Sequence, residues 1–360
     1  IWNINAPEQI GLHYSRYNNT GGDFVQKMQG TYYRGSDHDP AAVGLASGKT
    51  TGTKDVSIFN INDFHGRIDG TLNSNQTGLN TSNVGTYDTM QFVYTLEALR
   101  QQMGGDTNTV FLSAGDNVCA SLFASSLQGD QPTIDLLNTL GLEATAVGNH
   151  EFDQGYLDLI NRLAFEFDGP LIAANVYVDE TGKSLLPRYE FVEANGLKIA
   201  VTGAVTQETP TLVSPNNVAG LTFKDPVDSV NEVVAELEAL PATQRPDLIV
   251  AEYHEGAATG VPAGTLEQQV KDVPVFAKIV NETSPAVDVI FNGHTHQVYA
   301  WNGPIPGNTE GKTRPIVSTG SYGANIGQVT LTVKQTAQGT DVESYLAVNV
   351  PTAGTAASPC

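Results

Sequence analysis

Five short apolar runs in this chain each end at a residue whose side chain can ligate a metal ion. These residues are two aspartates, one asparagine and two histidines, namely Asp63, Asp116, Asn149, His254 and His294. Amphipathic stretches, such as residues 226–240 with one apolar stripe, lie between the runs. This alternation is typical of α/β construction. We therefore predict an α/β fold in which the five polar side chains stand at the carboxyl ends of strands.

Ligand sites in α/β sheets lie outside the carboxyl ends of the strands, so the five side chains are expected to share one crevice. A single histidine at a strand end is more often structural than a metal ligand. Five such residues are harder to explain, because each buried and unpaired polar group would cost several kcal/mol unless something coordinates it. His65 and His296 stand beside two of the five and bring the candidate ligands to seven.

The donor set of imidazole, carboxylate and amide, without cysteine, suits Zn²⁺, Mn²⁺, Fe or Co better than Ca²⁺ or Mg²⁺ alone. Seven candidate ligands exceed what one ion takes up, so we predict two divalent metal ions. The net charge of −21, from 39 acidic and 18 basic residues, argues against general affinity for nucleic acid or an anionic membrane. It does not exclude phosphate substrates, because bound divalent ions can reverse the local field.

The secondary structure follows from the same pattern, which becomes β-rich after His296. The expected strands are residues 56–61, 109–112, 144–147, 171–174, 197–202, 247–251, 287–291, 315–318, 324–333 and 341–348. The expected helices are residues 89–102, 132–140, 156–165, 226–240 and 266–280. No apolar run approaches the roughly 18 residues of a membrane span. Cys119 and Cys360 are expected to be a buried thiol and a terminal residue, with a disulfide in an exported protein as the alternative.

The motifs DFHG, GDN, GNHEFD, YHEG and GHTH occur in this order over residues 63–296. With them, about residues 55–335 resemble the calcineurin-like metallophosphoesterases, and the stretch GDNVCASLFASSLQGDQPTIDLLNTLGLEATAVGNHEFDQG is similar to the 5′-nucleotidase branch in particular. The resemblance implies a four-layer α-β-β-α sandwich. It also implies a metal-dependent phosphoric ester hydrolase, in which a metal-activated hydroxide attacks a phosphate ester that is most plausibly a nucleotide.

The resemblance also implies how the two ions are held. Asp63, His65 and His296 would hold the first ion, Asn149, His254 and His294 the second, and Asp116 both. His296 departs slightly from the family pattern, because related nucleotidases often have glutamine at that position.

Further residues near these motifs have implied catalytic or supporting roles. The resemblance makes His150 a transition-state stabiliser or the general acid at the leaving oxygen, and Asp153 the residue that orients its ring. A helix N-cap is the alternative for Asp153, and the two roles are compatible. We expect Glu151 and Glu255 at the rim of the site, where they support the ligands or are solvated. Arg67 could touch phosphate, but a surface salt bridge is the favoured interpretation.

Residues 1–45 have a different character and contain the motif SDHDP. This segment resembles the very end of the DNase I-like endonuclease/exonuclease/phosphatase fold, which would give Asp37 and His38 the roles of orienting acid and general base. The family's upstream catalytic residues are not in this sequence, so no working nuclease site is expected. We predict a remnant of such a domain at 1–45, a linker at 46–54, the metallophosphoesterase domain at 55–350 and a tail at 351–360. The alternative for 1–45 is an added edge strand and cover.

These resemblances imply a larger parent chain that fuses a nuclease to a phosphatase, in an extracellular, periplasmic or cell-surface location. The expected partner is a phosphate ester, with no direct binding of nucleic acid. The 5′-nucleotidase family carries a second domain that positions the substrate, and no counterpart of it is recognised here. A metal-binding but weakly active domain, or a phosphodiesterase on non-nucleotide esters, therefore stays as the alternative. Tyr253, Tyr299 and Trp301 could stack a base, with packing as the alternative.

Overall fold

The computed structural model describes residues 52–68, 89–336 and 339–352. The chain divides into two units, residues 1–50 and 51–360, and all described residues belong to the second. The predictions for residues 1–45, for Asp37 and His38 and for a Cys119–Cys360 bond thus involve residues outside the described ones. Cys119 itself is buried.

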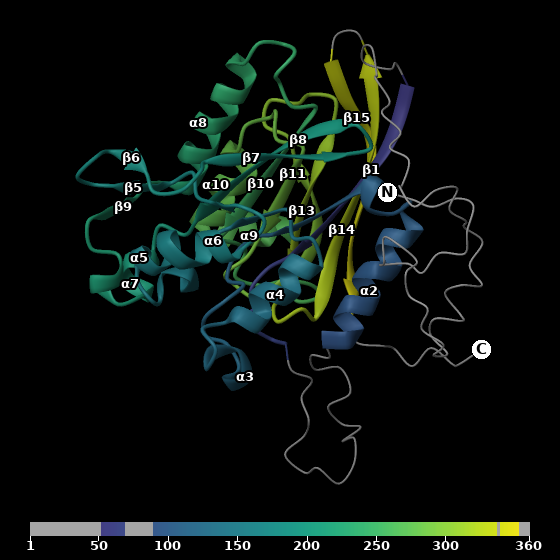
Figure 1. The fold of residues 1–360 in the computed structure, drawn as a ribbon. Helices are drawn as coiled ribbons and strands as arrows, with labels where there is room; N and C mark the ends of the chain where they lie inside the picture. The colour runs from purple at the N-terminus through teal and green to yellow at the C-terminus, as the bar shows by residue number, and fades with distance from the viewer. Residues whose placement is uncertain (1–51, 69–88, 337–338, 353–360) are drawn as a thin grey trace, which may run out of the picture. The chain divides into compact units, whose positions relative to one another are not determined.

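Two six-stranded sheets form the centre of the second unit (Figure 1). The first has the order β15 (Gly339–Pro351), β14 (Asn325–Thr336), β1 (Gly52–Ile61), β2 (Thr109–Ser113), β3 (Ala144–Ala146) and β4 (Leu171–Ile172). The second has the order β12 (Val298–Pro304), β13 (Thr313–Thr319), β11 (Val289–Asn292), β10 (Leu248–His254), β8 (Leu197–Val205) and β7 (Tyr189–Ala194). Strands β1 to β4 are parallel to one another, as are β8, β10, β11 and β13.

Helices and short turns connect these strands. The helices are α2 (Thr89–Gln102), α3 (Phe123–Ser126), α4 (Gln131–Thr139), α5 (Tyr156–Asp158), α6 (Ala164–Glu166), α7 (Thr209–Leu212), α8 (Pro226–Ala239), α9 (Leu266–Asp272) and α10 (Pro274–Glu282). The 3-10 and π turns are η2 (Asp106–Asn108), η3 (His150–Phe152), η4 (Leu159–Leu163) and η5 (Pro215–Asn217). A small third sheet joins β6 (Lys183–Ser184), β5 (Val176–Val178) and β9 (Leu221–Phe223). Among the described residues, no helix combines the length and apolarity that a membrane crossing requires.

Three clusters of buried apolar side chains fill the spaces between four layers. Val110 of the first sheet and Val250 of the second belong to the cluster between the sheets. Leu96 of α2 packs with Phe111 on the outer face of the first sheet. Val233 of α8 belongs to the cluster on the outer face of the second sheet. Since helices cover both outer faces, the predicted α-β-β-α sandwich is confirmed.

The structure corrects several boundaries of the sequence prediction, among them that of the helix expected at 156–165, which is divided into α5, η4 and α6. The single helix expected at 266–280 is two helices that meet at Val273, because Pro274 has no N–H for the helix and its ring clashes with the preceding turn. β1 begins at Gly52, inside the predicted linker, and pairs with β14 from its first residue. Pro351 is the last residue of β15 rather than part of a tail.

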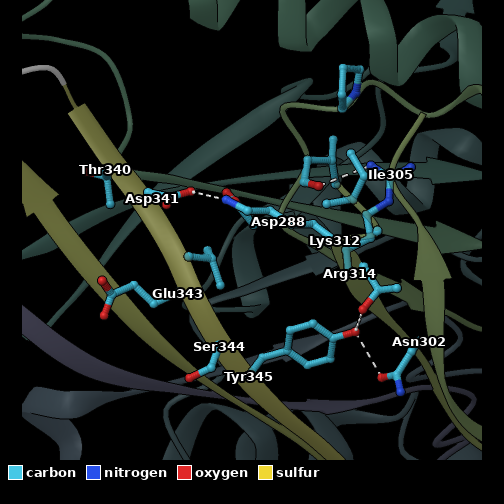
Figure 2. A pocket seen from close by; sticks show the side chains of 15 residues that line it. Asp288, Asn302, Ile305, Lys312, Arg314, Thr340, Asp341, Glu343, Ser344 and Tyr345 are labelled. Atoms are coloured by element: carbon cyan, nitrogen blue, oxygen red, sulfur yellow. Dashed lines mark hydrogen bonds and ion pairs between the residues drawn. The ribbon is translucent and has the colours of Figure 1, made fainter. Parts of the chain in front are cut away.

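A cavity of about 490 Å³ opens at the amino ends of β11 and β13 (Figure 2). Arg314, which lines it, is almost completely buried. The Arg314 guanidinium donates hydrogen bonds to the carbonyls of Thr283 (2.9 Å) and Ser284 (2.6 Å), which follow the last residue of α10. Because the last carbonyls of a helix have no partner within the helix, Arg314 caps α10.

Candidate metal centre

The ends of five strands meet at the other end of the sandwich. Asp63, Asp116 and Asn149 follow β1, β2 and β3 of the first sheet, whereas His254 is the last residue of β10 and His294 follows β11 of the second. These are the strands whose ends the sequence marks with polar residues. The structure brings the five side chains together across the gap between the two sheets, with His65 and His296 beside them.

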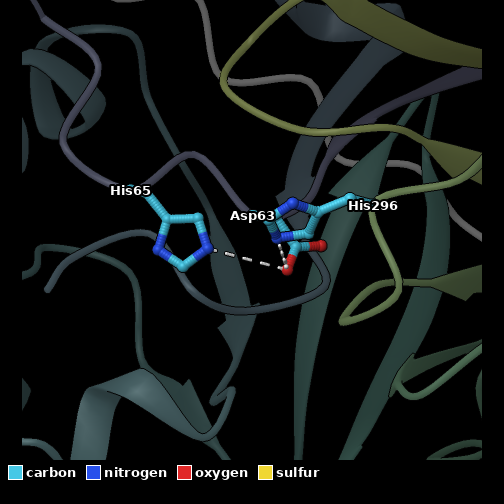
Figure 3. Close-up of side chains that lie close together, drawn as sticks. All are labelled: Asp63, His65 and His296. Atoms are coloured by element: carbon cyan, nitrogen blue, oxygen red, sulfur yellow. Dashed lines mark ion pairs between the residues drawn. The ribbon is translucent and has the colours of Figure 1, made fainter. Parts of the chain in front are cut away.

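The first group of candidate ligands is Asp63, His65 and His296 (Figure 3). Oδ1 of Asp63 lies 3.1 Å from Nε2 of His296 and 3.8 Å from Nε2 of His65. Oδ2 accepts hydrogen bonds from the side chain of Asn62 (2.7 Å) and the backbone N–H of His294 (2.9 Å). Oδ1 is buried and accepts no hydrogen bond. One carboxylate oxygen is thus fixed by the protein, while the other is left for a ligand.

The second group centres on Asp116. Its Oδ2 lies 3.0 Å from Nε2 of His254 and 3.7 Å from Nε2 of His65. Nε2 of His254 also lies 3.3 Å from Oδ1 of Asn149, and His294 completes the group with its ring 5.2 Å from that of His254. Asp116 therefore stands between the two groups and touches both.

Backbone carbonyls orient two of the histidines. Nδ1 of His65 donates to the carbonyl of Cys119 (3.0 Å), and Nδ1 of His254 donates to that of Ala114 (2.8 Å). When Nδ1 carries the donated proton in a neutral imidazole, Nε2 presents its lone pair, which is how proteins orient metal-ligating histidines. In both rings it is Nε2 that faces the carboxylates.

The charges of the cluster favour the binding of a cation. Burial alone would lower the pKa of His254, but the carboxylates of Asp116 and Asp63 raise it to about 10. Burial and the neighbouring charge of His254 lower the pKa of His294 to about 4. A proton on His254 thus partly offsets two buried carboxylates. A divalent ion would displace that proton, because metal binding requires deprotonated ligands. The oxygen and imidazole donors, with one orphaned carboxylate oxygen, fit divalent metal ions.

Glu151 supports the ligand loops from below. The prediction that Glu151 and Glu255 lie at the rim is wrong, because both are buried. Oε2 of Glu151 accepts from the backbone N–H of Asp116 (3.0 Å) and Gly148 (2.6 Å), and Oε1 accepts from that of Asn117 (2.8 Å). This carboxylate therefore fixes the backbone on which Asp116 stands. Glu255 accepts hydrogen bonds from a threonine hydroxyl and its neighbour's N–H.

His150 and Asp153 form a pair beside the cluster. Nδ1 of His150 lies 2.7 Å from Oδ2 of Asp153, and the backbone N–H of His150 donates to Oδ1 of Asp116 (2.8 Å). The hydrogen bond that His150 donates to Asp153 is the main cause that raises the pKa of His150 to about 9. Asp153 does not cap the next helix, since α5 has Gly155 at its N-cap and no side-chain cap. Of its two predicted roles, the geometry is that of the orienting one.

Five of the seven candidate ligands share an uncommon backbone conformation. Positive φ angles of 51°, 50°, 56°, 70° and 55° occur at Asp63, His65, Asp116, His294 and His296. The left-handed region costs non-glycine residues of order 1 kcal/mol each, so it persists only where the surroundings impose it. Five such residues in one cluster are typical of a functional site, where strain fixes side-chain direction.

Sequence reasoning missed several residues that shape the site. Asn62 holds Asp63, and its position inside the NDFHG stretch was the available signal. Tyr322, in the loop after β13, packs its ring against His296 and carries no motif. For the aromatic residues, the packing alternative is confirmed, since Tyr253 and Tyr299 are fully buried and Trp301 stacks on Tyr299.

Comparisons with known proteins agree with this geometry. Residues 56–298 match the family model described as calcineurin-like phosphoesterase. The chain is 31% identical over 294 residues to the endonuclease YhcR of Bacillus subtilis, which covers 78% of this chain and 22% of that protein. It is 28% identical over 252 residues to a 5′-nucleotidase of Vibrio vulnificus, covering 70% and 42%. It is also 28% identical over 321 residues to the cell wall protein Lmo0130 of Listeria monocytogenes, covering 80% and 39%.

The fold itself has a solved counterpart. The calcineurin-like phosphoesterase YfkN of Bacillus subtilis superposes with a TM-score of 0.63 at 22% identity, over 84% of this chain and 92% of that one. The chain spans less than half the length of the curated relatives named above. The family match extends over most of the sandwich and includes every strand that carries a candidate ligand. This chain belongs to the calcineurin-like phosphoesterase family.

Proposed function

We propose that this chain hydrolyses phosphate esters with the help of two divalent metal ions, and that its substrates are nucleotides. The observation that carries the proposal is the pair of adjacent ligand groups that meet at Asp116, whose Oδ2 lies near Nε2 of both His65 and His254. The imidazole, carboxylate and amide donors of these two groups suit Zn²⁺, Mn²⁺, Fe or Co. The similarity to a protein named 5′-nucleotidase supports the nucleotide as the substrate class.

Seven side chains would hold the ions. The first ion is assigned to Asp63, His65 and His296, the second to Asn149, His254 and His294, and both to Asp116. When bound, two such ions supply positive charge to the phosphoryl oxygens and lower the pKa of a water that attacks phosphorus. The orphaned Oδ1 of Asp63 and the inward-facing Nε2 atoms of His65 and His254 support this assignment.

His150 and Asp153 would act on the leaving group. Asp153 binds Nδ1 of His150, which leaves Nε2 free to donate a proton to the leaving oxygen. The His150 backbone N–H holds Asp116 at the same time, so the acid and the shared ligand keep a fixed relation. The role of Asp153 is to position and charge the imidazole.

The cellular context is part of the proposal. We infer a location outside the cytoplasm, which the similarity to a protein named a cell wall protein supports. Similarity to a protein named an endonuclease supports a longer parent chain that degrades nucleic acid. The assignment of residues 1–45 to a nuclease remnant rests on the sequence resemblance of SDHDP and the residues around it.

Metal removal and restoration test the function. The protein is stripped with a chelator and reloaded singly with Mn²⁺, Zn²⁺ or Co²⁺. Hydrolysis of 4-nitrophenyl phosphate, bis(4-nitrophenyl) phosphate, 5′-AMP and a cyclic nucleotide is then measured. We expect turnover that depends on the metal and is fastest with 5′-AMP. No metal-dependent turnover on any of the four would contradict the proposal.

Asp116→Ala is the matching variant. Asp116 lies next to a histidine of each ligand group. The variant should therefore lose bound metal and activity together, with metal affinity reduced at least about 100-fold. Asp341→Ala serves as the control, since it removes an exposed carboxylate at the opposite end of the sandwich. Elemental analysis should find bound metal in Asp341→Ala and little in Asp116→Ala.

A further inference from the structure

Arg67 lies beside the first ligand group without belonging to it. It follows His65 by two residues, and its guanidinium carbon lies 4.1 Å from the centre of the Tyr322 ring. The same ring packs against His296 at 5.4 Å and His65 at 5.8 Å between ring centres. One tyrosine thus joins the arginine to two candidate metal ligands.

The positive charge of Arg67 has no carboxylate partner among the described residues. Its guanidinium makes no ion pair with another described residue, and its Nε is buried without a hydrogen bond. Arg162 and Arg188, by contrast, each pair with two carboxylates. The surface salt bridge that sequence reasoning favoured for Arg67 is therefore absent among the described residues. A guanidinium whose N–H groups lack acceptors, next to a candidate metal site, is suited to bind an anion from solution.

The backbone fixes both members of the pair to the ligand loops. The N–H of Tyr322 donates to the carbonyl of Asp63 (2.7 Å), and the N–H of Gly66 donates to that of Asn117 (3.0 Å). Gly66 has a φ of 57°, and a Cβ there would lie 2.3 Å from Oγ of Ser121. The residue before Arg67 must therefore be glycine, which sets where the arginine leaves the loop.

The negative charge around the site would repel a phosphate, and the Arg67 guanidinium would offset part of that charge. The chain carries a net charge of −21, and Asp63, Asp116 and Glu151 are all buried in or under the site. A guanidinium presents parallel N–H donors that match two oxygens of one phosphoryl group. The ring of Tyr322 holds that guanidinium by a cation–π contact.

We propose that Arg67, held by Tyr322, binds the phosphoryl oxygens of the substrate from within the metal-binding fold itself. This inference rests on the proposed function, and it adds a preference. A phosphate monoester offers a dianionic group with one more charged oxygen than a diester. Arg67 should therefore favour monoesters over diesters.

Three substitutions test the role of Arg67. Arg67→Ala should raise KM for 4-nitrophenyl phosphate and Kd for inorganic phosphate about 10- to 100-fold, the range for a lost charged hydrogen bond, with a smaller change in kcat. Arg67→Lys keeps the charge without the fork and should fall between wild type and alanine. Arg245→Ala removes one exposed arginine before β10, at the far end of the sandwich, as a matched control of net charge. Kd is measured by calorimetry on the Mn²⁺-loaded protein.

Two substitutions test the role of Tyr322. Tyr322→Phe keeps a ring under the guanidinium, whereas Tyr322→Leu removes it. We expect the leucine variant to lose more phosphate affinity than the phenylalanine variant. In every variant the metal content should equal that of the wild type. The ratio of monoester to diester kcat/KM should fall most in Arg67→Ala.

The outcomes separate this inference from the proposed function. Unchanged phosphate affinity in Arg67→Ala, or loss of metal in that variant, would overturn the inference even if the wild type is an active hydrolase. Arg67-dependent phosphate binding by a wild type that hydrolyses none of the esters would support the inference while the proposed function fails. A metal-loaded wild type that binds no phosphate would overturn the inference as well.

Discussion

The two ends of the sandwich differ in how their buried polar groups are hydrogen-bonded. At the amino ends of β11 and β13, the hydroxyl of Tyr345 lies 2.6 Å from Oγ1 of Thr313 and donates to Asn302 (2.9 Å) (Figure 2). Nε of Arg314 lacks a partner there, but its other nitrogens donate three hydrogen bonds to carbonyls. At the carboxyl ends, an orphaned oxygen of Asp63 faces histidines in a strained backbone.

The contrast shows that the presence of a cavity is a poor guide to function in this molecule. The cavity of about 490 Å³ lies at the end where polar groups serve the fold. The candidate metal centre is marked instead by a buried carboxylate oxygen of Asp63 that accepts no hydrogen bond and faces histidines. A folded chain tolerates such atoms where a ligand completes them.

The largest expected effect separates chemistry from binding at the metal end. His150→Ala should reduce turnover about 10²- to 10⁴-fold, the scale of a positioned acid–base group. Metal content should not change, because the backbone N–H of residue 150 still donates to Asp116. Steady-state kinetics and elemental analysis check the two parts. Asp153→Asn should cost less, about 10- to 100-fold. Loss of both metals from His150→Ala would make His150 a ligand.

One substitution at each end of the sandwich tests whether stability and metal binding are separate. Arg314→Met removes the cap of α10, and Glu151→Ala leaves four backbone N–H groups without this acceptor. Each should lower the free energy of unfolding of the metal-free protein by about 3 kcal/mol, measured with denaturant. Only Glu151→Ala should weaken metal binding, since only Glu151 holds the Asp116 loop. Equal loss of metal in both variants would show that the two ends are coupled and would contradict their separate roles.

The smallest effect concerns an ordinary helix cap outside both regions. The side chain of Asp225 accepts from the N–H of Val227 and Asp228 and pairs with Lys278. Burial raises the pKa of Asp225, but the hydrogen bond from Asp228 and the contact with Lys278 outweigh it and lower the pKa below 3.8. Asp225→Ala should cost about 1 kcal/mol at pH 7.

The sign of the pH dependence follows from the lowered pKa. The ionised Asp225 stabilises the fold above pH 3.8, and this contribution is lost as the pH falls through the lower folded value. Denaturant unfolding should therefore show wild type and Asp225→Ala converging as the solution is acidified below pH 3.8. Asp225→Asn keeps a capping oxygen and serves as the control. A difference that grows on acidification would contradict this account.

Local patterns were sufficient to predict most elements of the fold. Helix α2 has the predicted ends, because its apolar stripe and flanking residues are both local signals. The five polar strand ends were also readable, since parallel strands deliver their last residues to one edge. The break at Pro274 was readable too and was missed, because the apolar period continues across it.

The supporting contacts could not be predicted, because they join residues far apart in the chain. Nothing in the sequence near Glu151 tells that its carboxylate reaches backbone groups 34 and 35 residues away. The stacking of Arg67 on Tyr322 likewise depends on β13 ending beside β1. Sequence reasoning therefore named the candidate ligands but misplaced Glu151 and preferred a salt bridge for Arg67.

The order of strands in the first sheet has a consequence for how the protein is made. β14 lies beside β1, although more than 260 residues separate them, and it pairs with β1 over nearly its whole length. All seven candidate ligands leave the ribosome before β14 does, yet one edge of the strand that leads to Asp63 stays unpaired until then. Assembly of the metal centre thus waits for a strand that supplies none of its ligands.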